Sequence, residues 1–193
     1  TVWHEVGEMS TQSWSSALLT PEEADLLPDA TAYELENGVL KERDMATDSV
    51  TIAYNIGLEF GIYARANGGN AYGEGLGLRL WPGQRRFVRP DACYFAPGAL
   101  PPGAPGAREL VTSPPTIAVE VISPGDAAID VRRKTLEYLA AGVKAAWEVY
   151  PDLGMIYVHR DGEPPQILPR TSTIRNMPEL PGFECDVASL FPP

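Results

Sequence analysis

RPDACYF (residues 89–95) and TIAVEVIS (residues 116–123) both have the composition of β-strands, and each places one carboxylate among apolar neighbours: Asp91 in the first and Glu120 in the second. A carboxylate within a strand that packs on a core is costly unless a cation, a proton or hydrogen bonds compensate it. Two explanations stay open. Each carboxylate pairs with an arginine, or the two converge on one divalent metal ion, because Mg²⁺ favours one or two carboxylates with water and phosphate.

The segment after Glu120 adds a lysine to this pair. Residues 127–141 have helical spacing, and the sequence predicts a helix that is capped by Asp126 and ends at Gly142. Lys134 is either a solvated helix lysine or points toward the strand of Glu120, where it can orient or deprotonate a water and stabilise charge on phosphorus. Helical spacing groups Lys134 with Asp130, Glu137, Tyr138 and Ala141, and directs an apolar stripe of Val131, Leu136, Leu139 and Ala140 elsewhere.

The remaining pattern predicts one α/β domain, a mixed sheet with helices packed on it. Asn37-Gly38 between two strand-like runs predicts a β-hairpin, and Thr20 with Pro21 predicts the start of a short helix before it. Further expected elements are a helix over 49–66, a hairpin of strands 76–82 and 87–95, a surface loop over 96–115, strands over 145–150 and 155–160, an edge strand over 164–170 and a short helical turn near the end. We expect a single domain over residues 1–193, with residues 1–19 as a peripheral segment.

Charge and hydropathy exclude several classes of protein. The net charge is −11, and residues 1–50 carry eleven acidic residues against only Lys41 and Arg43. An acidic chain is a poor general binder of nucleic acid, although a local basic track is available to an enzyme, either Arg79, Arg85, Arg86 and Arg89 or Arg132 and Arg133. No apolar run approaches the roughly 20 residues that span a bilayer, and no export signal is visible, so we expect a cytoplasmic protein.

The cysteines and histidines point away from disulfides and zinc. Cys93 and Cys185 lack CxxC spacing in a chain large enough to fold without staples, which favours reduced packing residues. His4 and His159 are too few and too far apart for a zinc site. A bound metal would therefore need oxygen ligands.

The order of these motifs resembles a known superfamily. RPD (89–91) followed by VEVIS (119–123), then a helix with RRK and EYLAAGV and the strand AAWEVY (145–150), is similar to the PD-(D/E)XK nucleases. The resemblance is strongest to their Uma-two branch of restriction endonucleases, because YELENG (33–38) matches that family's N-terminal hairpin and LPGFECDVASLF (180–191) its C-terminal signature. The similarity implies a restriction-endonuclease-like mixed β-sheet flanked by helices, with an N-terminal β-hairpin.

The resemblance also implies roles for single residues. Asp91 and Glu120 would ligate Mg²⁺ or Mn²⁺, and Lys134 would supply from the helix the lysine that other members carry two residues after the glutamate, where this chain has Ile122. Glu34 matches a recurring acidic residue and is a fourth candidate, with Glu36 as the alternative. A histidine common near the start of the family's first long helix is absent, so its role is not carried over.

Three functions compete on these observations. The first is a metal-dependent endonuclease that cuts DNA, for which a homodimer would provide two sites by pairing edge strands or the ASLF segment (188–191). The second is an inactive nuclease-fold protein that serves as an assembly or regulatory module. The third, nucleotide binding by GEGLGLRLWPG (73–83), fails because these glycines precede a strand and no Lys-Ser/Thr follows.

Overall fold

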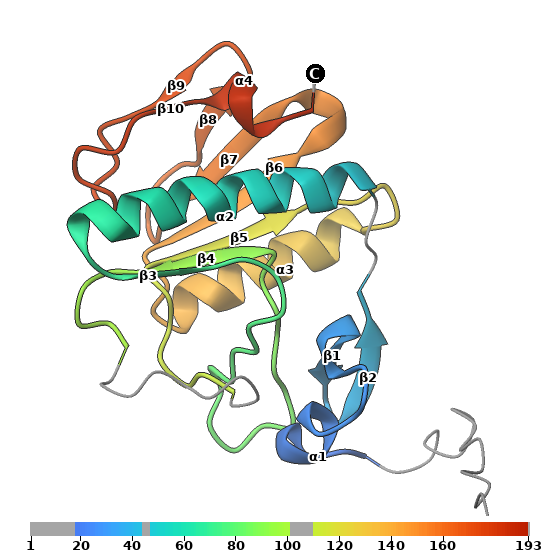
Figure 1. Ribbon diagram of the computed structural model, residues 1–193. Helices are drawn as coiled ribbons and strands as arrows, with labels where there is room; N and C mark the ends of the chain where they lie inside the picture. Colours follow the sequence, from blue (N-terminus) through green and yellow to red (C-terminus); the bar gives the residue numbers. More distant parts are fainter. Residues whose placement is uncertain (1–17, 44–46, 101–109, 193) are drawn as a thin grey trace, which may run out of the picture.

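A six-stranded mixed sheet forms the centre of the protein (Figure 1). The structure is a computed structural model that describes residues 18–43, 47–100 and 110–192. The strand order is β3-β4-β5-β6-β7-β8, and all neighbours are antiparallel except β5 and β6, which are parallel. The strands are β3 (Asn70–Tyr72), β4 (Ala92–Phe95), β5 (Ile117–Val121), β6 (Ala145–Tyr150), β7 (Met155–His159) and β8 (Gln166–Pro169).

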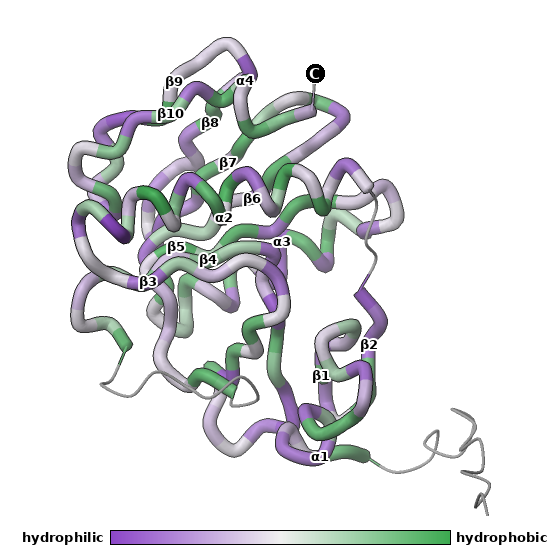
Figure 2. Tube along the Cα trace, viewed as in Figure 1, coloured by the Kyte–Doolittle hydropathy of each residue, from purple (hydrophilic) through white to green (hydrophobic). Residues whose placement is uncertain are grey.

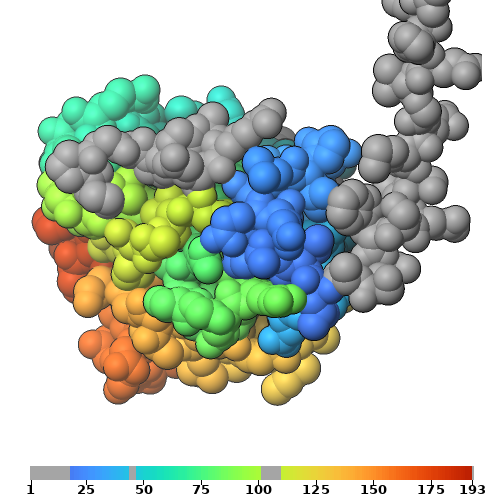
Figure 3. All heavy atoms as spheres, turned by 90° about the horizontal axis from the view of Figure 1, so that it is seen from below, coloured from blue at the N-terminus to red at the C-terminus, as the bar shows by residue number. Residues whose placement is uncertain are grey.

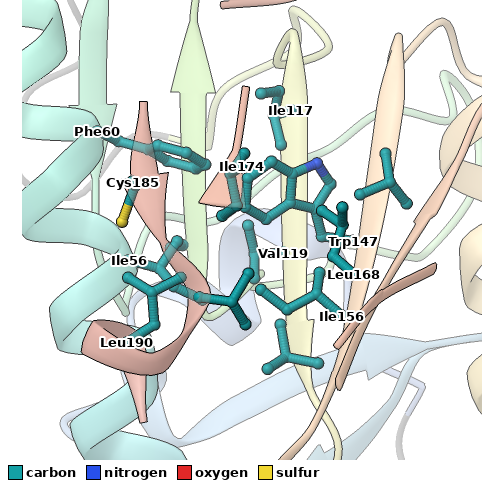
Figure 4. Close-up of a cluster of buried hydrophobic side chains, with 14 of the residues drawn as sticks. Ile56, Phe60, Ile117, Val119, Trp147, Ile156, Leu168, Ile174, Cys185 and Leu190 are labelled. Carbon is teal, nitrogen blue, oxygen red and sulfur yellow. The ribbon is translucent and has the colours of Figure 1, made fainter. Parts of the chain in front are cut away.

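Two long helices cover opposite faces of this sheet. The helix α2 (Thr47–Asn67) crosses one face, and α3 (Ala128–Ala140) makes the crossover from β5 to β6 on the other. On the α2 face, Phe60 packs edge-on against Trp147 with ring centroids 5.3 Å apart, as Figure 4 shows. The C-terminal elements β9 (Thr173–Ile174), β10 (Cys185–Asp186) and α4 (Val187–Leu190) close the same core. The α3 face has its own apolar cluster around Tyr138 and Cys93.

A small N-terminal unit packs against one end of the sheet. It consists of α1 (Pro21–Asp25), the 3₁₀ turn η2 (Ala30–Ala32) and the hairpin of β1 (Tyr33–Glu36) and β2 (Val39–Glu42). The hairpin bonds to the segment that precedes β4, since Leu35 and Phe87 exchange backbone hydrogen bonds of 3.1 Å. Figure 3 shows this unit in blue beside green residues from that part of the chain. The contact brings β1 next to the ends of β4 and β5.

Several local predictions are confirmed. Thr20 caps α1 in a full capping box with Glu23, and Asn37 and Gly38 adopt the positive φ angles of a tight hairpin turn. The helix α3 ends at Gly142, whose φ is 102°. The expected strands in the second half of the chain are present as β6, β7 and β8, although β8 begins at Gln166. The proposed peripheral segment lies mostly outside the described residues, as do residues 101–109 of the predicted 96–115 loop.

The predicted hairpin of strands 76–82 and 87–95 is only partly correct: Leu78 and Val88 exchange two antiparallel backbone hydrogen bonds, but the two segments form no regular ladder. Leu78 makes only isolated bridges, to Val88 and Val111, and the regular strand β4 begins at residue 92. The partner of β4 is instead β3, which directly follows two glycines. A side chain at Gly69 would clash with the Phe95 carbonyl oxygen at 2.4 Å, so these glycines also let β3 approach β4.

The details of α3 also differ from the expectation. Asp126 does not cap the helix, because its carboxylate accepts a hydrogen bond from the Ser123 N–H at 2.8 Å instead. The buried residues of α3 are Thr135 and Tyr138, whereas the residues of the apolar stripe differ in burial: Leu136 is 51% exposed and Leu139 packs on the apolar cluster of this face. Within the described ranges, no helix has both the length and the apolar composition needed to cross a bilayer.

Candidate active site

Asp91 and Glu120 lie together where β4 begins and β5 ends. Glu120 lies two residues after Ala118 in β5, so both share the face that α3 covers. Asp91 is fixed to β5 from both sides: its N–H donates to the Val119 carbonyl at 2.9 Å, and its Oδ2 accepts from the Val121 N–H at 2.7 Å. The backbone thus holds the two carboxylates on adjacent strands.

The helix α3 supplies the partners of Glu120. Lys134 Nζ donates to Glu120 Oε2 at 2.8 Å, and the Tyr138 hydroxyl donates to Glu120 Oε1 at 2.7 Å. Residues four apart lie on one side of a helix, so a single helix face delivers both donors. The prediction that Lys134 reaches the strand of Glu120 agrees with this geometry; its catalytic role stays a prediction.

Glu34, and not Glu36, joins this group. Glu34 Oε1 accepts hydrogen bonds from Lys134 Nζ at 2.8 Å and from the Arg89 N–H at 2.7 Å. Glu36, two residues further along the hairpin, forms an ion pair with Lys41 instead. Both glutamates lie on the same face of β1 and line the same cleft, so the contact with Lys134 is what distinguishes Glu34.

An arginine also reaches Asp91. Arg43, just beyond β2, donates from Nη2 to Asp91 Oδ1 at 2.6 Å. The sequence left open whether the strand carboxylates pair with arginines, and Asp91 does so while Glu120 pairs with Lys134. Sequence reasoning missed Arg43 because its distance of 48 residues from Asp91 leaves no local signal.

Burial raises the pKa of both strand carboxylates. It raises the pKa of Glu120 to about 7, although Lys134 opposes the rise. Burial also raises the pKa of Asp91, against the opposing effects of the Val121 N–H and Arg43. A bound cation would relieve this cost by favouring both charged forms.

Lys134 is held as a cation. Burial alone would lower its pKa, but the carboxylates of Glu120 and Glu34 raise it above its usual value. Burial would likewise raise the pKa of Glu34, yet Lys134 and the N–H of Arg89 lower it. Lys134 therefore serves as a fixed positive charge, and this arrangement favours charge stabilisation over proton abstraction.

A cleft of about 330 Å³ opens beside these residues. The N-terminal hairpin, the segment around residues 86–88, the end of β5 and the start of α3 line it. Its positively charged lining residues are Lys41, Arg43, Arg86, Arg133 and Lys134. Seven acidic residues line it as well, so the cleft as a whole is not cationic: Glu34, Glu36, Glu42, Asp91, Glu120, Asp126 and Asp130. Its basic residues are nevertheless groups that can contact a phosphate.

The predicted basic track of four arginines is wrong for Arg89. That side chain is 3% exposed and binds Asp25, the Gly75 carbonyl and the Tyr33 carbonyl. Acidic residues of the N-terminal unit pair with basic residues elsewhere, as Glu22 does with Arg79. Part of the acidity near the chain's start is therefore neutralised by these contacts.

The donor set fits a hard divalent cation with few protein ligands. Among the described residues, no group of three or more His, Cys, Asp or Glu side chains is arranged to hold a metal ion. Asp91 and Glu120 offer two carboxylates, and Mg²⁺ commonly takes one or two with its other positions filled by water and substrate phosphate. The residues present fit Mg²⁺ or Mn²⁺ better than a closed, zinc-like site.

Comparison with known proteins places this geometry in context. A family model described as Uma2, putative restriction endonuclease, matches residues 21–188. Among solved structures, the fold is similar to that of a putative nuclease belonging to DUF820 from Anabaena variabilis ATCC 29413, with a TM-score of 0.73 and 18% identity over 90% of this chain and 97% of that one. This confirms the predicted restriction-endonuclease-like fold. None of the curated proteins matches the sequence.

Proposed function

The chain belongs to the Uma2 family of putative restriction endonucleases, and on that premise we propose that it is a metal-dependent endonuclease that hydrolyses phosphodiester bonds in DNA. The observation that carries the proposal is the contact of Lys134 with both Glu120 and Glu34 at 2.8 Å, beside Asp91. Three carboxylates and one lysine meet from four separate segments at the edge of a cleft that is lined by both acidic and basic residues. Side-chain charges this costly to bury are typical of functional sites.

Each residue has a distinct task in this proposal. Asp91 and Glu120 hold a Mg²⁺ or Mn²⁺ ion, which when bound acidifies a water and neutralises charge on the phosphate. Lys134 orients the attacking water and stabilises the negative charge that grows on phosphorus. Glu34 keeps the ammonium group of Lys134 in place, and Tyr138 fixes the carboxylate of Glu120.

DNA is the proposed substrate because of the family and because basic residues lie among the acidic residues of the cleft. Arg86 and Arg133 line the cleft and can contact phosphates on either side of the scissile bond. Both also pair with acidic residues, Arg86 with Glu137 and Arg133 with Asp130. Such pairing limits non-specific attraction, so we expect weak and strongly salt-dependent binding to DNA. A homodimer would allow both strands to be cut.

Plasmid cleavage tests the proposal directly. We expect supercoiled DNA to be nicked or linearised in Mg²⁺ or Mn²⁺, and EDTA to stop the reaction. Glu120→Gln should abolish cleavage, whereas Glu148→Gln should retain it. Glu148 is a matched control because it pairs with Glu120 in register on the next strand and does not line the cleft. Cleavage that persists in Glu120→Gln would overturn the assignment.

One observation favours the second function, an inactive assembly or regulatory module. Arg43 and Lys134 already neutralise Asp91 and Glu120, so the carboxylates have a structural role without any bound ion. Under this alternative, Asp91→Asn and Glu120→Gln would change stability but no DNA would be cleaved by the wild type under any metal condition.

A further inference from the structure

The outer face of α2 carries an exposed apolar ridge. Val50, Tyr54, Leu58 and Ile62 are 38%, 67%, 43% and 48% exposed, respectively. They follow one another at intervals of four residues and therefore form a continuous row along one side of the helix. The opposite side of α2, with Ile56 and Phe60, packs on the sheet. We call these four residues the α2 ridge.

This face is unusual for a helix on the surface of an acidic protein. A helix that covers a core normally turns charged and polar residues to solvent. Between Asp48 and Arg65, however, Glu59 is the only charged residue in the sequence. Figure 1 shows α2 lying across the sheet as a surface layer, and Figure 2 shows hydrophobic segments recurring along its length. Both sides of α2 are thus suited to packing.

We propose that the α2 ridge is a homodimer interface in which α2 packs antiparallel against α2 of a second copy. A row of residues four apart packs into the grooves between rows three apart when two helices cross at about 20°, which keeps the ends of the two helices close. In an antiparallel pair centred between residues 57 and 58, Tyr54 lies opposite Gly61 of the second copy. A side chain added at Gly61 would meet nothing within 4 Å, so this position leaves room for the ring of Tyr54.

The charges at the ends of the ridge favour a second copy over other occupants. Asp48 lies at the start of α2 and Arg65 in its last turn, so an antiparallel pair brings each near its opposite on the second copy. A chain with a net charge of −11 repels its own copy over most of its surface, and the nearly uncharged ridge is where close approach costs least. A membrane surface fits poorly, because interfacial helices carry lysines and arginines beside their apolar face.

The area involved indicates a weak dimer. Standard interfaces bury about 800 Å² per partner, and a single pair of helices with its flanks falls at or below that value. We therefore expect the dimer to dissociate at micromolar rather than nanomolar concentrations. The proposal does not depend on the proposed nuclease activity, because no ridge residue lines the cleft.

Sedimentation equilibrium of the full chain tests the interface. We expect a concentration-dependent monomer–dimer equilibrium for the wild type, and at least tenfold weaker association for Leu58→Glu. Leu136→Glu is the matched control, because Leu136 is a leucine on the other long helix with 51% exposure, and it should associate like the wild type. Ile167→Glu, on the edge strand β8, tests pairing through the sheet edge.

Two outcomes would overturn the proposal. One is a wild type that stays monomeric at the highest concentration reached; the other is a dimer that Ile167→Glu weakens and Leu58→Glu does not. If Leu58→Glu fails to fold by circular dichroism, charge exchange replaces it. Asp48→Arg and Arg65→Asp should each weaken the dimer, and the double variant should restore it; a double variant weaker than either single variant contradicts antiparallel packing.

Discussion

The two faces of the central sheet come from the same strands but bury different chemistry. On the α2 face, Val119 and Trp147 belong to a large cluster of buried hydrophobic side chains. On the α3 face, Glu120 and Glu148 stand side by side in register on β5 and β6. An apolar face needs only matching volume, whereas each buried carboxylate needs its own donors. The helix α3 provides both donors of Glu120 and one donor of Glu148. We therefore expect the functional site on the α3 face, where the buried carboxylates make folding more costly.

The largest loss of stability should come from a substitution in the apolar core on the α2 face. Phe60→Ala removes a fully buried ring that packs on Trp147, Tyr94 and Phe183. We expect it to lower the free energy of unfolding by about 3–5 kcal/mol. Urea denaturation measures this, with Leu136→Ala as an exposed control that should lose less than about 0.5 kcal/mol. Equal losses in the two variants would contradict the assignment of the core.

Next in size is the loss of the lysine on the other face. Lys134→Met removes the positive charge shared by Glu34 and Glu120, so we expect DNA cleavage to fall by about 10²–10³-fold. The chain offers Lys144→Met as a control, since Lys144 is exposed at the opposite end of β6. Single-turnover cleavage rates provide the comparison. Lys144→Met losing as much activity as Lys134→Met would argue for a general charge effect.

A smaller loss of stability should follow from removing the hydroxyl of Tyr138. Tyr138→Phe leaves Glu120 Oε1 without its 2.7 Å donor while keeping the ring in the core. The free energy of unfolding should fall by about 1–2 kcal/mol. Thermal unfolding checks this against Tyr54→Phe, where the ring is 67% exposed and no change is expected. An unchanged melting temperature in Tyr138→Phe would show that the hydrogen bond adds nothing to stability.

The smallest change, here in the rate of DNA cleavage, should come from a substitution of Glu36, the other glutamate of β1. Glu36 pairs with Lys41 and Arg133 near solvent, and exposed ion pairs contribute about 0.2–1 kcal/mol. Glu36→Gln should change cleavage by less than about threefold on that basis. Glu34→Gln in the same assay should cost clearly more, because it loosens Lys134. The reverse order would make Glu36 the fourth site residue.

Local rules predicted the parts of the structure that depend on local geometry. The period of a strand placed Glu120 on the face opposite Val119, and helical spacing put Lys134 and Tyr138 on one side of α3. Asn37-Gly38 and Gly142 marked a turn and a helix end, because both need the positive φ angles found there. These features follow from a few neighbouring residues.

The remaining features depend on contacts between distant segments. The site's Arg43 and the buried Arg89 have partners more than forty residues away in sequence, and nothing near either residue reveals them. Lys134 is largely buried because Glu34 and Glu120 bind it, and the hydrophobicity pattern of α3 does not reveal this. The strand β3 is three residues long and gave no periodic signal.

Titration calorimetry with Mg²⁺ and Mn²⁺ tests the central claim, that Asp91 and Glu120 form a metal site, most directly. The account predicts one ion per wild-type chain, loss of binding in Asp91→Asn and Glu120→Gln while both stay folded, and unchanged binding in Glu148→Gln. Wild type that binds no ion up to millimolar metal, or variants that bind as the wild type does, would contradict it and leave the carboxylates with a purely structural role.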